Sequence, residues 1–203
     1  MKIQWHGHSC FQIDTQGYCV VFDPYEDGSV KGLAPLRLTA DAVYCSHGHH
    51  DHNARSVVAL TGRDCPVQVD TVSCFHDDKL GVLRGKNTIH ILSSEGLRVA
   101  HLGDLGHMLS GRKLEAIKGV DVLLLPVGGF YTIDAATAKK LAEAVAPRVV
   151  IPMHYRLGGM GFDVLAQLGE YTGLCDDVRH YDTNTMEIGA DTPAQTAVLT
   201  YGK

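Results

Sequence analysis

The feature that most constrains this chain is a dense group of potential metal ligands directly after its apolar segment 42–45. His47, His49, Asp51 and His52 form the pattern H-x-H-x-D-H. Side chains two residues apart on an extended segment point to the same side, so the first three can converge. His52 breaks that period and can face a neighbouring metal. A surface histidine cluster or a purification tag is the alternative, but a tag would be terminal. The pattern therefore predicts a metal site.

Single acidic or histidine residues recur just past other apolar, strand-like segments. Asp23 follows segment 19–22, and His76, Asp104 and His154 stand in the same position after later segments. In layered α/β folds, ligands bind in the crevice outside the carboxyl ends of the strands. We therefore expect these side chains to share one cleft with the histidine cluster. Histidine makes up 12 of the 203 residues, an abundance that also favours a metal site.

Short strands and helices are expected to alternate along a mixed α/β chain with a layered sheet core. The clearest helix is predicted over 134–145, with Asp134 as its N-cap and an apolar stripe at Ala138, Leu141, Ala142 and Val145. Weaker helices are predicted over 53–61, 110–118 and 163–170, and segment 24–40 is expected to be a loop. The predicted strands cover 2–5, 10–14, 18–22, 41–46, 67–74, 87–92, 97–101, 121–125, 148–151 and 196–201.

Composition limits the class of protein. At 203 residues and 45% apolar content, a single domain over 1–203 is the simplest interpretation. The net charge of -5 and the lack of a basic run argue against a nucleic-acid partner. No apolar run of transmembrane length and no signal-peptide core are present, so we expect a cytoplasmic protein without integral membrane association. The six cysteines form no CxxC motif and are expected to be reduced.

Several motifs together resemble a known family. The chain carries H-x-H-x-D-H, then an isolated His, a Gly-Asp and a final His, with Trp5-His6-Gly7-His8-Ser9-Cys10-Phe11, Phe22-Asp23-Pro24 and Pro126-Val127-Gly128-Gly129. This set resembles the metallo-β-lactamase superfamily. Within it, the motifs are similar to a branch of small bacterial metal-dependent hydrolases related to L-ascorbate-6-phosphate lactonase and N-acyl-phosphatidylethanolamine phospholipase D.

The resemblance implies an αββα sandwich of metallo-β-lactamase type with two divalent metal ions at one edge. It assigns His47, His49 and His76 to one metal and Asp51, His52 and His154 to the other, with Asp104 bridging. Asp51 and Asp104 are then the catalytic carboxylates. The ligands are nitrogen and oxygen only, which suits Zn²⁺ and also Mn²⁺, Fe²⁺ or Ni²⁺. Two neighbouring segments depart from the pattern of many relatives: Leu102-Gly103-Asp104-Leu105-Gly106-His107 around the bridging residue, and His76-Asp77.

Other residues are candidates for substrate binding or for supporting the ligands: His8, Asp23, His107, Tyr155 and Arg156. Asp23 is expected to orient a ligand histidine, the alternative being a turn-forming Asp before Pro. A Tyr and an Arg directly after His154 could hold an oxyanion and an anionic group, or could simply be packed and solvated. Loops 24–40 and 156–162 are candidate lids. His50 is expected to point away from the site. His101 is expected to be a buried structural residue.

Open ligand positions on two metals suit catalysis better than a closed structural site. We therefore expect a metal-bridging hydroxide to attack a carbonyl centre in a lactone, ester or amide of a small molecule. A phosphodiesterase or phospholipase-type activity is the alternative, followed by a non-catalytic metal-binding or sensing module. A homo-oligomer is compatible with so short a chain.

Overall fold

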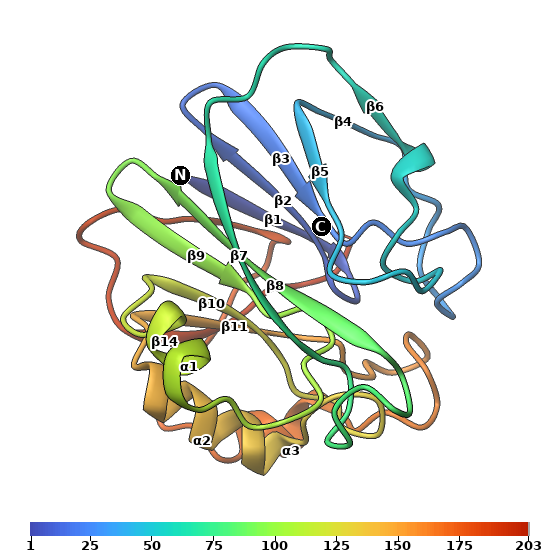
Figure 1. Cartoon of the computed structure of the whole chain (residues 1–203), viewed down its shortest axis with the longest axis vertical. Helices are drawn as coiled ribbons and strands as arrows, with labels where there is room; N and C mark the ends of the chain where they lie inside the picture. The colour runs from blue at the N-terminus through green and yellow to red at the C-terminus, as the bar shows by residue number, and fades with distance from the viewer. Residues whose placement is uncertain (203) are drawn as a thin grey trace.

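The computed structural model describes residues 1–202 and contains two β-sheets packed face to face (Figure 1). The five-stranded sheet has the order β13-β1-β2-β3-β5, with bounds β1 Lys2–Gly7, β2 Cys10–Thr15, β3 Tyr18–Phe22, β5 Ala42–Tyr44 and β13 Thr185–Glu187. The seven-stranded sheet has the order β12-β14-β11-β10-β9-β8-β7, with bounds β7 Gln68–Phe75, β8 Lys86–Ser94, β9 Leu97–His101, β10 Val122–Pro126, β11 Val149–Met153, β12 Val178–His180 and β14 Gln195–Val198.

The main core lies between the two sheets and extends to the helices. Alternation along the strands decides which side chains enter it: Val20 and Phe22 of β3 join the main core, whereas Val21 between them faces the other side. The central strands β10 and β11 are buried at every position. They are flanked by parallel neighbours and covered on both faces, which explains their continuous apolar runs.

Three helices cover the outer face of the seven-stranded sheet, as Figure 1 shows: α1 Gly111–Ile117, α2 Ala135–Val145 and α3 Leu168–Thr172. The predicted apolar stripe of α2 is confirmed, since its buried residues are Ala138, Leu141, Ala142 and Val145. Asp134 is its N-cap and accepts a 2.8 Å hydrogen bond from the Thr137 backbone N–H. Among residues 1–202, no helix reaches the length and apolarity of a membrane span.

The outer face of the five-stranded sheet is covered without an α-helix in residues 1–202. The covering is segment 24–36 and a two-stranded sheet of β4 (Leu38–Ala40) and β6 (Val58–Leu60), which bury Val21 of β3 beneath them. The helix predicted over 53–61 is therefore wrong. Only the short 3₁₀ helix η1 (Arg55–Val57) forms there, and the chain then extends to pair with β4. Tertiary pairing outweighs the weak helical pattern.

The structure differs from the sequence predictions at two further places late in the chain. The helix predicted over 163–170 begins only at Leu168, because the Ala166 backbone is used to pair with Gly128 and Arg156. Strands β12 and β13 have no counterpart in the predicted set. They are three residues long and mostly exposed, so their sequences carry little alternation.

Strand direction gathers one set of strand ends at a single edge. β1, β3 and β5 run in the same direction in the first sheet, as do β7, β9, β10 and β11 in the second. Asp23, His76, Asp104 and His154 all lie just past the carboxyl ends of these strands. The shared cleft predicted from the sequence is therefore possible at this edge.

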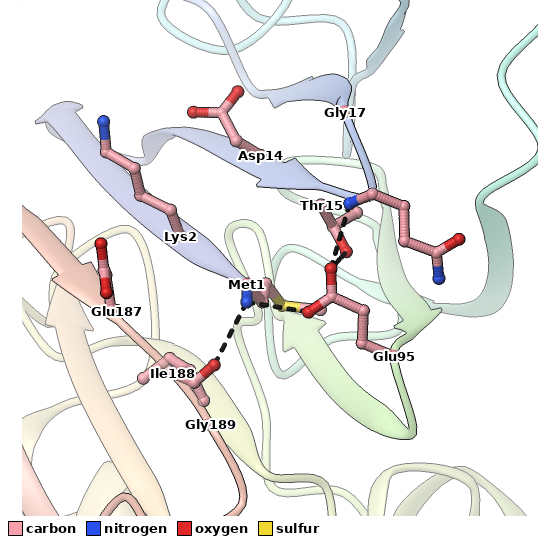
Figure 2. A pocket seen from close by; sticks show the side chains of 10 residues that line it. Met1, Lys2, Asp14, Thr15, Gly17, Glu95, Glu187, Ile188 and Gly189 are labelled. Carbon is pink, nitrogen blue, oxygen red and sulfur yellow. Dashed lines mark hydrogen bonds and ion pairs between the residues drawn. The ribbon is translucent and has the colours of Figure 1, made fainter.

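The opposite edge holds a different hollow, shown in Figure 2, near the starts of β1 and β3. There the Met1 amine donates to Glu95 Oε2 at 2.9 Å, and Glu95 Oε1 accepts from Thr15 Oγ1 at 2.9 Å. These contacts join the β2–β3 turn of the first sheet to the β8–β9 turn of the second. The hollow, of about 430 Å³, is open to solvent, and none of the metal-donor clusters in residues 1–202 lies there.

The cap of α2 gives a stability prediction. Asp134→Ala removes the acceptor for the Thr137 N–H and should lower the free energy of unfolding by about 1 kcal/mol. Urea unfolding followed by circular dichroism measures this change. Asp134→Asn, which keeps a capping oxygen, should cost less; equal stability of the wild type and Asp134→Ala would show that the cap contributes nothing.

Candidate metal centre

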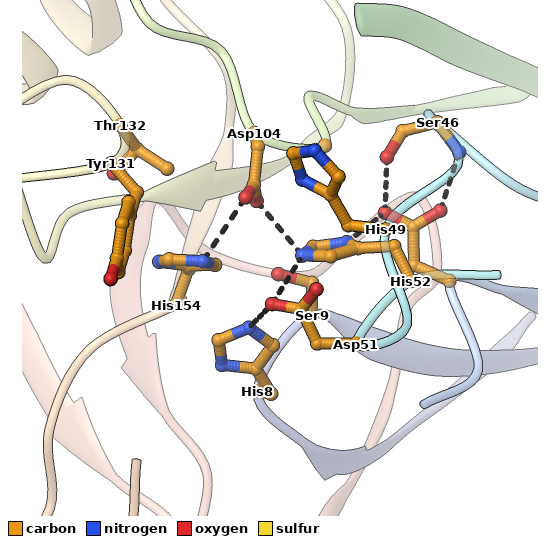
Figure 3. A network of polar contacts seen from close by, with 12 residues as sticks. His8, Ser9, Ser46, His49, Asp51, His52, Asp104, Tyr131, Thr132 and His154 are labelled. Atoms are coloured by element: carbon orange, nitrogen blue, oxygen red, sulfur yellow. Dashed lines mark hydrogen bonds and ion pairs between the residues drawn. The ribbon is translucent and has the colours of Figure 1, made fainter. Parts of the chain in front are cut away.

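Imidazole and carboxylate atoms converge at the edge where β3, β5, β7, β9 and β11 end. Within each of three overlapping groups, the donor atoms all lie within 4.8 Å of one another. The groups are His47, His49 and His76; His8, Asp51, His52 and His154; and His47, His52 and Asp104. Figure 3 shows how Asp51, His52, Asp104 and His154 point toward a common centre. Segments far apart in the sequence thus meet as predicted.

Asp104 lies between the group of His47, His49 and His76 and the group of His8, Asp51, His52 and His154. Its Oδ2 is 3.2 Å from His76 Nε2 and 3.2 Å from His154 Nε2, while its Oδ1 is 3.2 Å from His52 Nε2. The residue is 2% exposed. Burial alone would raise the pKa of Asp104, but the neighbouring His154 and His52 outweigh it and hold that pKa well below its ordinary value. Asp104 is therefore an ionised carboxylate placed to contact both groups.

Asp23 fixes the histidine-rich loop after β5. Its Oδ1 accepts a 2.6 Å bond from the Ser46 backbone N–H, and its Oδ2 accepts from Ser46 Oγ at 2.5 Å and His52 Nδ1 at 2.7 Å. Burial opposes a charge here, but His101 and His52 lower the pKa of Asp23 below its ordinary value. An ionised carboxylate only accepts, so His52 carries its proton on Nδ1 and presents Nε2 to the centre.

Similar contacts orient two other histidines. His76 Nδ1 lies 3.1 Å from the Tyr131 carbonyl oxygen, which can only accept, so the proton is on Nδ1 and Nε2 is free. Ser46 Oγ donates to Asp23 and therefore accepts from His47 Nδ1 at 2.9 Å. His47 Nε2 is then also unprotonated. Each contact prepares a nitrogen lone pair for a metal ion.

The loop that carries Asp104 is held by a buried amide. The Asp104 N–H donates to Asn87 Oδ1 at 2.9 Å, and Asn87 Nδ2 donates to the Leu102 carbonyl at 2.9 Å. Gly103 between them has φ +53, and a Cβ there would lie 2.4 Å from the Cβ of Ser46. Only glycine fits this close approach, which brings the β9 and β5 loops together.

The buried atoms of the donor set decide whether metal ions fit this site. His52 Nε2, His154 Nε2 and Asp104 Oδ1 are fully buried, and none has a hydrogen-bond partner among residues 1–202. Buried polar atoms are normally satisfied, so orphaned ones aimed at a common point need an explanation. A bound cation supplies one, because it accepts a lone pair from each atom at once. The residues fit divalent metal ions.

Burial disfavours the charged form of both His47 and His52, but the outcome differs between the two residues. Desolvation lowers the pKa of His47 to about 3, assisted by the neighbouring His52. His52 is the exception: burial disfavours its charge, but Asp104 and Asp23 outweigh that effect and raise its pKa. A cation bound at His52 Nε2 replaces the proton that these carboxylates would otherwise attract.

Further histidines that the sequence analysis did not assign to a metal lie near this centre or the loop that carries it. His8 Nε2 is 3.2 Å from Asp51 Oδ2, so His8 supports Asp51 from behind. Desolvation and the neighbouring His154 lower the pKa of His8 to about 4. His101 is buried and bonds to the Ser9 carbonyl at 2.8 Å, and His50 is exposed beside Glu26. Both predicted placements agree with the structure.

Three candidates do not line the cavity beside the donors. Tyr155 packs against Trp5, with ring centroids 5.7 Å apart, in a hollow behind His8. Arg156 uses its backbone N–H to bond Ala166, in the loop before α3. His107 accepts from the Phe75 N–H at 3.3 Å and lines a separate hollow next to the centre.

The cavity at the donors is small, about 220 Å³. Its walls include two residues that the sequence candidates omit, Arg84 and Phe162, together with Tyr131. The signal for Arg84 is a cation in the loop directly after a predicted ligand, His76. Phe162 comes from one candidate lid loop, which contacts the other: the Gly161 N–H donates to the Lys31 carbonyl at 2.9 Å.

Comparison with known proteins identifies the family of the chain. The family model of the beta-lactamase superfamily domain matches residues 2–154. The chain belongs to the metallo-β-lactamase superfamily. A UPF0173 metal-dependent hydrolase from Carboxydothermus hydrogenoformans is 28% identical, with 84% of this chain and 90% of the relative covered. Another from Archaeoglobus fulgidus is 30% identical, covering 76% of this chain and 83% of the relative.

Solved structures confirm the predicted fold class. A crystal structure from Thermotoga maritima, ascribed to a Zn-dependent hydrolase of the metallo-β-lactamase superfamily, superposes with a TM-score of 0.78 at 33% identity, covering 98% of this chain and 97% of that one. This superfamily member is therefore a metal-dependent hydrolase in its general activity. The comparisons do not distinguish the branch named from the sequence motifs, and that assignment stays a prediction.

The Asp23 contacts predict how metal binding depends on residues behind the ligands. Asp23→Asn removes the charge that keeps His52 in its Nδ1–H form, so metal affinity should fall by about 10- to 100-fold. Competition with a fluorescent zinc chelator measures the affinity. Asp14→Asn, a matched change on the far edge of the first sheet, should leave it unchanged; an unaltered affinity in Asp23→Asn would contradict the role given to this carboxylate.

Proposed function

We propose that the chain is a binuclear metal-dependent hydrolase that cleaves a carbonyl bond, in a lactone, ester or amide, of a small molecule. The observation that carries the proposal is the set of buried, unpartnered donor atoms that converge beneath a small cavity. A structural metal site would be closed by its ligands, whereas these ligands border open space.

We assign His47, His49 and His76 to one divalent ion and Asp51, His52 and His154 to the other, with Asp104 shared. The position of Asp104, 3.2 Å from donors of both groups, supports this division. Zn²⁺ is the favoured ion, since the nitrogen and oxygen donors suit it and the similar Thermotoga maritima protein is described as Zn-dependent. Ligands come from both sheets, which supports treating 1–203 as one functional domain.

When bound, the two ions supply Lewis acidity, which activates water and stabilises negative charge that develops on the substrate oxygen. Asp51 borders the cavity and supplies the proton acceptor. Burial opposes its ionisation, but the neighbouring His52 and the hydrogen bond from His8 lower the pKa of Asp51 below its ordinary value. His8, neutral at pH 7, donates from Nε2 to Asp51 Oδ2 and leaves the other carboxylate oxygen to take a proton from water.

The cavity favours a small substrate. Its volume of about 220 Å³ is below the ~300–1,000 Å³ range common for ligand pockets. Tyr131 and Phe162, with ring centroids 5.8 Å apart, form an aromatic side above the donors. Such walls exclude water from the reacting bond and suit a compact organic molecule better than a polymer.

The metal content tests the binuclear part of the proposal. Protein purified without chelator should contain about two transition-metal ions per chain, because the donors exceed what one tetrahedral ion needs. Elemental analysis gives the number directly. Chelation should also lower the melting temperature, since ions that bind only the folded state stabilise it. A reproducible single ion at full occupancy would contradict the binuclear assignment.

Asp104 tests the mechanism. Asp104→Asn keeps the size of the side chain but removes its charge, so the rate of hydrolysis should fall by more than about 100-fold. This loss exceeds the roughly 10- to 100-fold that is usual when a residue supporting a metal ligand is replaced. A panel of lactones, 4-nitrophenyl esters, anilides and bis(4-nitrophenyl) phosphate identifies the accepted class. Asp191→Asn, an exposed acid, is the matched control. Wild-type turnover by Asp104→Asn would place the activity elsewhere, and cleavage of the phosphodiester alone would favour phosphoryl transfer.

A further inference from the structure

A single cationic side chain borders the metal-side cavity. His49, Asp51, His76 and Asp104 form its polar part, and Arg84 is the one Lys or Arg among the lining residues. Arg84 lies in the loop between β7 and β8, and this loop begins at His76. Any molecule bound in so small a volume lies close to both the donor groups and this guanidinium.

The guanidinium of Arg84 has no acidic partner among residues 1–202. Arg37, Arg63 and Arg148 each pair with an aspartate, at 2.7, 2.7 and 2.5 Å. The Arg84 Cζ instead lies over the Tyr131 ring, 5.4 Å from its centroid. Stacking on an aromatic face holds a guanidinium in place and leaves the N–H donors at its edge available for an anion.

The backbone of the Arg84 loop is fixed from within. The buried Asp77 carboxylate accepts hydrogen bonds from the backbone N–H groups of Lys79, Gly81, Leu83 and Arg84, at 2.8, 2.9, 3.0 and 2.8 Å. A carboxylate with this many donors makes a loop rigid, since loosening any part of it leaves a buried charge less satisfied.

We propose that Arg84 is the specificity-determining residue of the cavity and that it selects substrates carrying a carboxylate or phosphate group beside the bond to be cleaved. Asp77 is the positioning residue that holds Arg84 over the site. The proposal rests on the hydrolase function argued above and narrows its substrate class to small anions. Cations bound at the donor groups would add to the same attraction, although the chain as a whole carries a net charge of -5.

Anion binding by the metal-loaded protein tests the proposal without relying on turnover. Malonate, succinate and glutarate are titrated calorimetrically into wild type, Arg84→Met and Arg84→Lys, with the neutral diamide of each as a reference. Arg84→Met keeps an apolar stem but no charge, so the best-bound dicarboxylate should lose about tenfold or more in affinity. Arg84→Lys should recover part of it, since the charge remains but the planar fork is lost.

Arg112→Met is the matched control. Arg112 is exposed on α1, so the substitution removes the same charge at a position away from the cavity. Asp77→Asn should weaken dicarboxylate binding as Arg84→Met does while the metal content stays at the wild-type level. That result separates positioning of Arg84 from damage to His76. If Asp77→Asn does not fold, the two Arg84 variants still decide the main point.

Equal dicarboxylate affinity in wild type and Arg84→Met, or no binding of any of the three by wild type, would overturn the proposal. Failure of the hydrolase function is a separate result: every substrate in the panel would be left intact, while dicarboxylate binding still depended on Arg84. For a hydrolysed pair, mono-4-nitrophenyl glutarate against 4-nitrophenyl butyrate, Arg84→Met should raise KM for the anionic ester only.

Discussion

The buried carboxylate of Asp104 lies among imidazoles from three separate segments, and the arrangement of the whole centre depends on that contact. An ionised carboxylate in the interior is unfavourable unless positive charge and hydrogen-bond donors surround it. Here Oδ1 finds no hydrogen-bond donor in residues 1–202, and His52 Nε2, 3.2 Å from it, is equally unsatisfied. The fold therefore places mutually incomplete groups together, which is the arrangement that a bound cation would stabilise. Metal binding at these residues would therefore also stabilise this edge of the molecule.

Residues that hydrogen-bond to the candidate ligands or to their backbone hold the donor groups in position. Asp23 holds the Ser46 backbone and His52, the Tyr131 carbonyl fixes the tautomer of His76, and Asn87 holds the Asp104 backbone. None of these contacts is made by a flexible surface side chain. Each links residues at or near the ends of two strands of the same sheet, so the position of one ligand depends on how the strands of that sheet are arranged. This interdependence explains why a site built from loops can be as rigid as the strands that carry it.

The two sides of the cavity have different origins. The donor side is formed by strand ends whose positions are dictated by the sheets. The opposite side is formed by loops: Arg84 from the β7–β8 connection, Tyr131 after β10 and Phe162 after β11. A fold that keeps its donors while changing such loops can accept different substrates with the same chemistry. The internal bonds of Asp77 give one of these loops a defined conformation, so the recognition side need not be mobile.

The sequence by itself determined which residues form the candidate metal centre and much of the layering. The H-x-H-x-D-H cluster, the polar residues at strand ends and the apolar stripe of α2 are local patterns, and local patterns follow from the periodicity of strands and helices. The tertiary structure alone decided that segment 58–60 is a strand, since β4 pairs with it. It also decided that Arg84, and not Arg156, borders the cavity. Both outcomes depend on contacts between residues distant in sequence or on the path of a loop, and no periodic pattern in the chain records either of them.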